Sequence, residues 1–269
     1  MKNRLPEGSP LLCVGVDPHR AVLEAWGCPD SAEGLAQFVS AIVPLIVESG
    51  CAVVKPQVAF FERHGLAGMR ALAVLLQDLR SHGLVVVGDA KRGDIGSTME
   101  GYAEAWLTPG SDFEVDALTV VPYQGVAALK PVLSLAAENS KGVFVLSATS
   151  NPEARDTQRA MRSDGVTVAS GVVHDLAGWV AENPSAVSTH GVVLGATLSC
   201  ADFGIDMAKY PGMPILAPGF GHQGAALSSA KALFPATSPV LAVVARSVLL
   251  SGEADFVEAV SVSESELSS

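Results

Sequence analysis

Short apolar runs rich in valine, leucine and isoleucine recur along the chain, separated by longer mixed segments. Runs of this length and composition predict buried strands. We expect eight strands, at Leu11–Val16, Ala52–Lys55, Leu84–Asp89, Ala117–Val121, Val143–Leu146, Gly191–Leu194, Ile215–Ala217 and Val240–Val244.

The segments between these runs have a helical periodicity. In Ser31–Glu48 the apolar residues recur every three or four positions, which is typical of a helix with one buried face, and Ser31 suits the N-cap. Gly65–His82 and Val166–Glu182 are further examples. Strands that alternate with helices in this way form parallel βα units. Eight units predict an α/β fold, a closed (β/α)₈ TIM barrel; an open doubly wound sheet is the alternative.

Chain length and composition fit one such barrel. The 269 residues, 49% apolar and 17% charged, suit a single domain with a large core, which we place at residues 1–260. The polar, acidic tail 261–269 predicts disorder, and the polar stretch 151–165 indicates a mobile loop or lid.

Several classes of protein are disfavoured. No apolar run approaches the roughly 20 residues of a membrane span, and residues 1–8 lack the apolar centre of a signal peptide, so we expect a cytoplasmic protein that does not bind membranes. The formal charge of −11 argues against a nucleic-acid partner. The cysteines form no Cys-x-x-Cys pair and the histidines have no ligand spacing with carboxylates, so no metal site is expected.

Charged residues stand where two neighbouring apolar runs end. Asp89 and Lys91 close the third run, Asp94 follows, and Lys55 ends the second run. Residues two apart on a strand share a face, so Asp89 and Lys91 should point the same way. A solvated turn with a salt bridge would explain this pair alone, and Lys55 could simply extend from the barrel rim. Because strand ends form the active-site face of a barrel, the set favours a catalytic array.

A glycine-rich loop follows the seventh expected strand, and Arg246 follows the eighth. Backbone N–H groups around Gly219 and Gly221 could hold a phosphate, and Arg246 could add a bidentate contact. Loops in these two positions are the usual phosphate site of phosphate-binding barrels. The glycines could be ordinary turn residues, but the arginine favours a phosphate site.

Together these motifs resemble orotidine 5′-phosphate decarboxylases, in the longer bacterial branch of that family. The resemblance rests on Asp89-x-Lys91-x-x-Asp94-Ile95-x-x-Thr98 with Lys55 one strand earlier, and it extends from about Asp17 to Ser247. Three further segments are similar to the family: 54–62, 149–152 and 218–224. The looser pattern Asp-x-Lys-x-x-Asp also occurs in sugar-phosphate enzymes of the same barrel group.

The resemblance implies decarboxylation of orotidine 5′-monophosphate to uridine 5′-monophosphate without a cofactor, the last step of pyrimidine nucleotide synthesis de novo. It implies a catalytic array of Lys55, Asp89, Lys91 and Asp94. It also implies that Asp17 binds the ribose, Ser150 the pyrimidine, and Gln223 and Arg246 the phosphate, beside the loop that contains Gly219 and Gly221. The family forms homodimers with shared active sites, which assigns Asp94, Ile95 and Thr98 to the partner's site. His222 and the pair Ser147-Ala148 depart from the family pattern, which leaves the conformation of these loops open.

Two other functions remain possible. A sugar-phosphate decarboxylase or aldolase of the same barrel group would need Mg²⁺ held by carboxylates. A non-catalytic barrel could use the charges only to bind a nucleotide, although simple binding does not need two buried acids. A sheet-type nucleotide-binding protein is disfavoured because no Gly-x-Gly-x-x-Gly follows the first strand.

Overall fold

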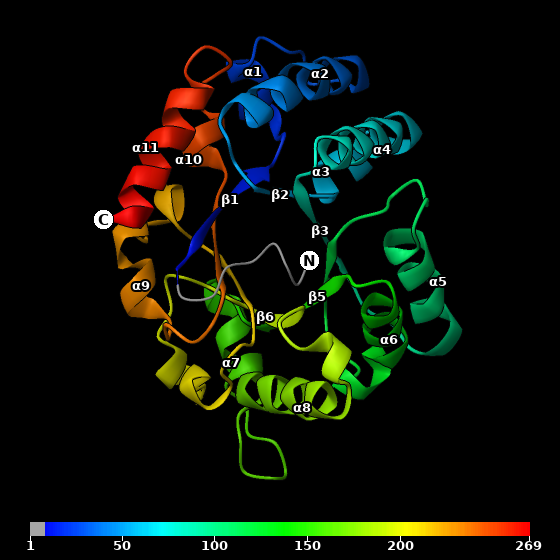
Figure 1. Cartoon of the computed structure of the whole chain (residues 1–269), viewed down its shortest axis with the longest axis vertical. Helices are drawn as coiled ribbons and strands as arrows, with labels where there is room; N and C mark the ends of the chain where they lie inside the picture. Colours follow the sequence, from blue (N-terminus) through cyan, green and yellow to red (C-terminus); the bar gives the residue numbers. More distant parts are fainter. Residues whose placement is uncertain (1–8) are drawn as a thin grey trace.

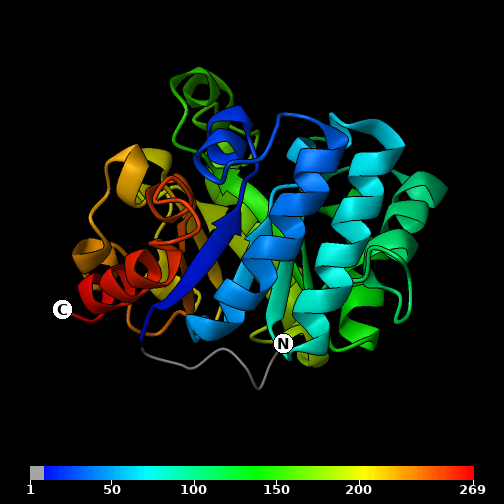
Figure 2. The same cartoon turned by 90° about the horizontal axis from the view of Figure 1, so that it is seen from above.

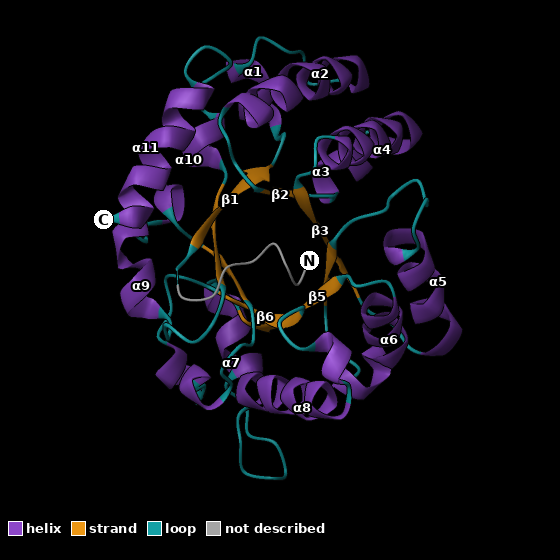
Figure 3. Cartoon of the chain, in the orientation of Figure 1, coloured by secondary structure: helices purple, strands orange, loops and turns teal. Residues whose placement is uncertain are grey.

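Eight parallel strands close into a barrel in the computed structural model, which describes residues 9–269 (Figure 1, Figure 3). Each strand pairs with the next, and the eighth pairs with the first, which confirms the predicted TIM barrel. The strands are β1 (Leu11–Val16), β2 (Val53–Pro56), β3 (Val85–Arg92), β4 (Ala117–Val120), β5 (Gly142–Ala148), β6 (His190–Leu194), β7 (Ile215–Pro218) and β8 (Val240–Val244). All eight lie on the expected runs. The expectation about a signal peptide at residues 1–8 falls outside the described residues.

Helices surround this barrel, as Figure 3 shows. They are α1 (Arg20–Ala25), α2 (Ala32–Glu48), α3 (Ala59–Glu62), α4 (Gly65–Ser81), α5 (Gly96–Leu107), α6 (Lys130–Glu138), α7 (Arg155–Gln158), α8 (Val168–Glu182), α9 (Ala230–Leu233), α10 (Arg246–Leu249) and α11 (Phe256–Ser268). The long helices α2, α4 and α8 confirm the periodicity, and Ser31 caps α2 by accepting a hydrogen bond from the Gly34 N–H (3.2 Å). After β6 the chain forms the 3₁₀ turns Cys200–Phe203 and Met207–Lys209. No described helix is both long and apolar enough to cross a membrane.

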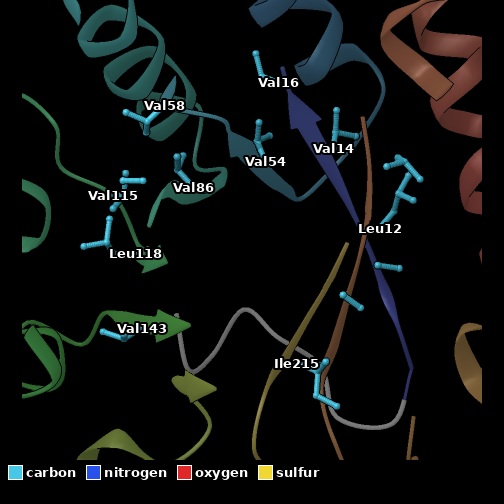
Figure 4. Close-up of a cluster of buried hydrophobic side chains, with 14 of the residues drawn as sticks. Leu12, Val14, Val16, Val54, Val58, Val86, Val115, Leu118, Val143 and Ile215 are labelled. Atoms are coloured by element: carbon cyan, nitrogen blue, oxygen red, sulfur yellow. The ribbon is translucent and has the colours of Figure 1, made fainter. Parts of the chain in front are cut away.

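Alternate residues of each strand belong to two different apolar layers. Val14, Val54 and Val86 belong to the large layer between the barrel and the helices, part of which Figure 4 shows. Their neighbours Cys13 and Val53 belong to a smaller cluster inside the barrel. Strands buried on both faces are expected for a parallel sheet, and this explains why the runs are continuously apolar rather than alternating.

The same alternation delivers charged side chains to one end of the barrel interior. On β2, Val53 lies in the interior cluster and Lys55, two residues later, lines the cavity above it. On β3, Val85 and Val87 lie in the cluster and Asp89 lines that cavity. The interior therefore changes from apolar to charged toward the carboxyl ends of the strands. Figure 2 shows this barrel from a second direction, with β1 running toward α1.

The prediction of a disordered tail is wrong, because residues 261–268 continue helix α11. The buried face of this helix includes Phe256, Val260 and Leu267. Its end is also held by a hydrogen bond from the Leu227 N–H to the Glu266 carboxylate (2.9 Å). Apolar burial and this hydrogen bond stabilise a segment whose composition alone indicated disorder. The stretch 151–165 contains α7 and a β-bridge of Met161 with Thr167.

Candidate active site

The carboxyl ends of the strands surround a cavity of about 410 Å³. This volume suits a small-molecule ligand. Among its lining residues are the predicted Asp17, Lys55, Asp89, Lys91, Ser150, Gly219, Gln223 and Arg246. Polar residues to which the sequence assigned no role also line it: Gln57, Thr119, Thr149, Asn151 and His222. Gly221, Asp94, Ile95 and Thr98 are predicted site residues that are not among its lining residues.

Four charged side chains form an alternating array in the floor of this cavity. Lys55 Nζ lies 2.8 Å from Asp89 Oδ2 and 3.9 Å from Asp17 Oδ1. Lys91 Nζ lies 2.6 Å from Asp89 Oδ1. The side chain of Lys55 is only 6% exposed, whereas that of Lys91 is 42% exposed. Lys55 is therefore a nearly buried cation in the cavity floor, whereas the Lys91 ammonium group is accessible to a bound ligand.

The close pairs fix the charge states of the buried members. Burial alone would raise the pKa of Asp89, but Lys55 and Lys91 more than offset this and hold that pKa well below its usual range. Burial alone would lower the pKa of Lys55, but Asp89 and Asp17 hold it above its usual range. At neutral pH the cavity floor therefore carries an ionised Asp89 and a charged Lys55.

Asp17 differs from Asp89 because it lacks close partners. Burial raises its pKa more than the distant Lys55 lowers it, and its Oδ1 atom is buried without a hydrogen-bond partner among the described residues. An unsatisfied buried acceptor of this kind is costly. The Asp17 side chain as a whole is 22% exposed and lines the cavity, so its carboxylate can accept a hydrogen bond from a ligand hydroxyl.

Thr119 and Gln57 extend the array on both sides. The Thr119 hydroxyl donates to Asp89 Oδ1 (2.9 Å) and accepts from the backbone N–H of Lys91 (3.0 Å). With its amide oriented so that the nitrogen faces Asp89, Gln57 donates to the Asp89 carboxylate, and its oxygen accepts from Lys91 Nζ (3.2 Å). The sequence alone did not predict that Thr119 and Gln57 bind Asp89 and Lys91. The only feature that could have indicated it is that each is a polar residue at the carboxyl end of a predicted barrel strand.

The loop with Ser150 is held by side chains from the segment that follows it. The Gln158 amide accepts a hydrogen bond from the Thr149 N–H (2.9 Å) and donates to the Thr149 hydroxyl (2.9 Å). The same hydroxyl donates to Asn151 (2.8 Å). Ser150 itself is exposed and lines the cavity. Its hydroxyl is thus available to a ligand while its backbone is fixed.

The glycine loop after β7 forms another part of the cavity wall, next to Arg246 at the start of α10. Gly221 has φ +66°, and a Cβ added there would lie 2.7 Å from the Ser247 hydroxyl oxygen, so a side chain would displace α10. The N–H groups of Gly221 and Gly224 are bonded within the loop, to the carbonyls of Ala225 and Gly221. These two are therefore unavailable to an anion, and this wall offers a ligand the Gln223 and Arg246 side chains.

Asp94, Ile95 and Thr98 lie outside the cavity, at the beginning of α5. The Asp94 carboxylate accepts a hydrogen bond from its neighbour's N–H, that of Ile95 (2.8 Å), rather than from a lysine of the array. Ile95 is 60% exposed. The chain therefore does not bring Asp94 into its own array.

Residues 9–269 contain no cluster of three or more His, Cys, Asp or Glu side chains placed to hold a metal ion. Both carboxylates of the array face lysines instead. Each lysine therefore supplies a positive charge beside these carboxylates.

Comparison with known sequences agrees with this geometry. The orotidine 5′-phosphate decarboxylase / HUMPS family matches residues 10–260. An orotidine 5′-phosphate decarboxylase from Corynebacterium glutamicum is 47% identical over 226 residues, which are 81% of this chain and 77% of that protein. One from Salinispora tropica is 45% identical over 242 residues, 90% of this chain and 85% of that protein.

Solved structures give the same result. A candidate orotidine 5′-phosphate decarboxylase from Streptomyces avermitilis has a TM-score of 0.85 and 40% identity, with 99% of this chain and 91% of that chain covered. The OMP decarboxylase from Leishmania donovani has a TM-score of 0.78 and 27% identity, with 99% and 94% covered. With a family match over most of its length and relatives of this similarity, the chain belongs to the orotidine 5′-phosphate decarboxylase family.

Proposed function

We propose that this chain decarboxylates orotidine 5′-monophosphate to uridine 5′-monophosphate and CO₂ without a cofactor. The observation that carries the proposal is the alternating Asp17–Lys55–Asp89–Lys91 array in the cavity floor, within a chain of this family. The reaction breaks the bond between C6 of the pyrimidine and its carboxylate, and the electron pair stays on C6. The active site must therefore stabilise a carbanion that has little resonance relief.

Asp89 acts on the leaving group in this proposal. Its low pKa keeps it ionised, so a substrate carboxylate placed beside it would be repelled. Two like charges about 4 Å apart repel by roughly 4 kcal/mol at an effective dielectric constant near 20. Loss of CO₂ relieves this repulsion. The contact therefore raises the energy of the bound substrate more than that of the transition state.

Lys91 acts on the carbon left behind. Its ammonium group, half-exposed to the cavity and bonded to Asp89, would stand beside C6 and stabilise the developing negative charge. It would then donate a proton to C6, forming the product C–H bond, and regain a proton from water. Lys55, buried between Asp17 and Asp89, holds both acids in place and compensates their charge.

The remaining cavity residues would bind the rest of the nucleotide. The Asp17 carboxylate would accept a hydrogen bond from a ribose hydroxyl, and Ser150 would contact the pyrimidine. Gln223 and Arg246 would bind the phosphate, with Gly219 and Gly221 shaping the loop beside it. Binding energy from the phosphate end can offset the cost of desolvating the charged floor. A doubly charged phosphate ester does not cross membranes unaided, so the substrate stays in the compartment in which it is made. We therefore place the reaction in the cytoplasm.

We further propose a homodimer in which each chain completes the other's site. Asp94, Ile95 and Thr98 lie outside their own cavity at the exposed start of α5, and Ile95 exposes a large apolar side chain there. A contact with a second chain would cover this side chain. Asp94 from the partner would add the last acid to the array.

The decisive experiment is to add orotidine 5′-monophosphate with excess chelator and follow the ultraviolet change on conversion to uridine 5′-monophosphate. We expect full activity in the chelator and its loss in Lys91→Ala. Activity that disappears in the chelator and returns with Mg²⁺ would instead support the metal-dependent aldolase or decarboxylase. Nucleotide binding without any absorbance change would support the non-catalytic barrel.

A further inference from the structure

Lys91 has an unusual backbone conformation. Its φ is +49°, in the left-handed region that non-glycine residues seldom adopt. The pairing of β3 with β4 shifts register between Gly88 and Arg92, so Lys91 lies in a bulged or otherwise irregular part of the strand. Bulges near active sites re-aim side chains. Because the left-handed conformation is unfavourable for lysine, the surrounding structure must hold it there.

The peptide group between Ala90 and Lys91 is held at both of its polar atoms. Its N–H donates to the Thr119 hydroxyl (3.0 Å), and its carbonyl accepts from Arg92 Nη1 (3.1 Å). Rotation of this peptide group changes φ of Lys91 directly. The two hydrogen bonds therefore fix the torsion angle that aims the lysine.

Thr119 couples this peptide to the catalytic carboxylate. Its side chain is buried, with the residue only 1% exposed. Since the hydroxyl oxygen accepts from the Lys91 N–H, its own hydrogen is directed to Asp89 Oδ1 (2.9 Å). One hydroxyl thus sets the position of the Lys91 backbone relative to the Asp89 carboxylate.

Arg92 holds the same peptide from the outer side of the barrel. Its guanidinium forms an ion pair with Glu62 of α3 and lies 5.7 Å from the Tyr102 ring and 5.8 Å from the Trp106 ring of α5. Cation–π contacts and an ion pair restrain a planar guanidinium strongly. The Ala90 carbonyl is therefore tied to two helices.

We infer that Thr119 and Arg92 are positioning residues that hold the Ala90–Lys91 peptide from both sides and so aim the Lys91 ammonium at the reacting carbon. The inference rests on the proposed decarboxylation. Neither residue touches the substrate's reacting atoms, and each acts through the backbone of Lys91. Removal of either should therefore lower kcat more than it weakens nucleotide binding.

The first test compares Thr119→Val, which keeps the shape but loses both hydrogen bonds, with Thr119→Ser, which keeps them. We expect kcat to fall about 10- to 100-fold in Thr119→Val, with less than a threefold change in KM, and Thr119→Ser to retain most of the activity. Thr189→Val is the matched control, because Thr189 is another buried hydroxyl, at the start of β6 and bonded to Ala186 and His190. Its kcat should not change.

A second variant and a second readout complete the test. Arg92→Met keeps the apolar stem and loses the contacts with Ala90 and Glu62, and we expect kcat to fall several-fold to tenfold. In Thr119→Val the Lys91 amide hydrogen should exchange with solvent at least about fivefold faster than in the wild type, since its acceptor is gone. Amide exchange reports on the peptide whatever reaction the protein catalyses.

The outcomes separate this inference from the proposed function. Equal losses of kcat in Thr119→Val and Thr119→Ser, or a loss below threefold in Thr119→Val, would overturn it. So would unchanged exchange of the Lys91 amide. A wild-type protein that does not decarboxylate the nucleotide refutes the proposed function, and the exchange rates then decide the role of Thr119 alone.

Discussion

Replacement of Lys91 by alanine should nearly abolish turnover and leave the fold almost as stable as before. The side chain is 42% exposed, and its ion pair with Asp89 is open to solvent on one side. Exposed pairs contribute about 1 kcal/mol or less to stability, so we expect the midpoint of thermal unfolding to fall by only a few degrees. Asp89 keeps Lys55 and Thr119 as partners in the variant.

The loss of activity should be far larger, because one side chain supplies two effects. A positioned proton donor contributes about 10²- to 10⁴-fold, and a fixed charge beside a developing anion about 10²- to 10³-fold. Together they give about 10⁴- to 10⁷-fold, or about 5–10 kcal/mol at 1.36 kcal/mol per tenfold change. The contrast between a small loss of stability and a large loss of rate is the signature of the proposed role.

The assay follows absorbance on conversion of orotidine 5′-monophosphate, with enzyme made in a host that lacks its own decarboxylase. Lys209→Ala is the control, because Lys209 is 71% exposed and lies outside the cavity. Lys55→Met, unlike Lys91→Ala, should also destabilise the fold. The Lys55 side chain is 6% exposed, and its loss leaves the negative charges of Asp89 and Asp17 uncompensated. We expect that variant to lose about 3–5 kcal/mol of stability as well as activity. We expect Lys91→Ala to keep at most about one ten-thousandth of the wild-type kcat. If it keeps more than about one hundredth, the assigned mechanism is wrong.

Three further predictions concern other parts of the molecule. Arg246→Ala should lower kcat/KM for the nucleotide about 10- to 100-fold and leave the slow reaction of the phosphate-free nucleoside unchanged; equal losses for both would contradict a phosphate contact. The pKa of Asp89 is lower in the folded protein than in the unfolded chain, so the ionised carboxylate stabilises the fold above about pH 4, and this stabilisation is lost as the pH falls. The difference in free energy of unfolding between the wild type and Asp89→Asn, measured in urea, should therefore become smaller below that pH. Leu267→Ala should lower the free energy of unfolding by about 2 kcal/mol, because Leu267 is buried. Val262→Ala, at a position that is 60% exposed, should change the free energy of unfolding and the urea midpoint little.

The strands and the charged floor could be predicted from the sequence because both depend on local spacing. A buried run that ends in Asp89 or Lys55 carries its periodicity and its chemistry in the same few residues. Thr119 could not be assigned in this way. Its partners are the Lys91 N–H and the Asp89 carboxylate, and it meets them where the pairing of β3 with β4 shifts register. The role of a residue defined by a register shift is not visible from its own neighbours in the chain.

For residues 261–269 the sequence did contain the information, in the helical spacing of the apolar residues, but the polar composition of the segment favoured the wrong prediction. Phe256, Val260, Ser263 and Leu267 follow one another at four-, three- and four-residue spacing and form the buried face of α11. A serine stands in the middle of this stripe, and its hydroxyl donates back to the Ala259 carbonyl within the helix (2.9 Å), which satisfies it without a polar partner elsewhere. The surrounding serines and glutamates are on the exposed side, where they cost the helix little. Periodicity is therefore a better guide than composition at this terminus, because burial depends on where the few apolar residues lie and not on how many there are.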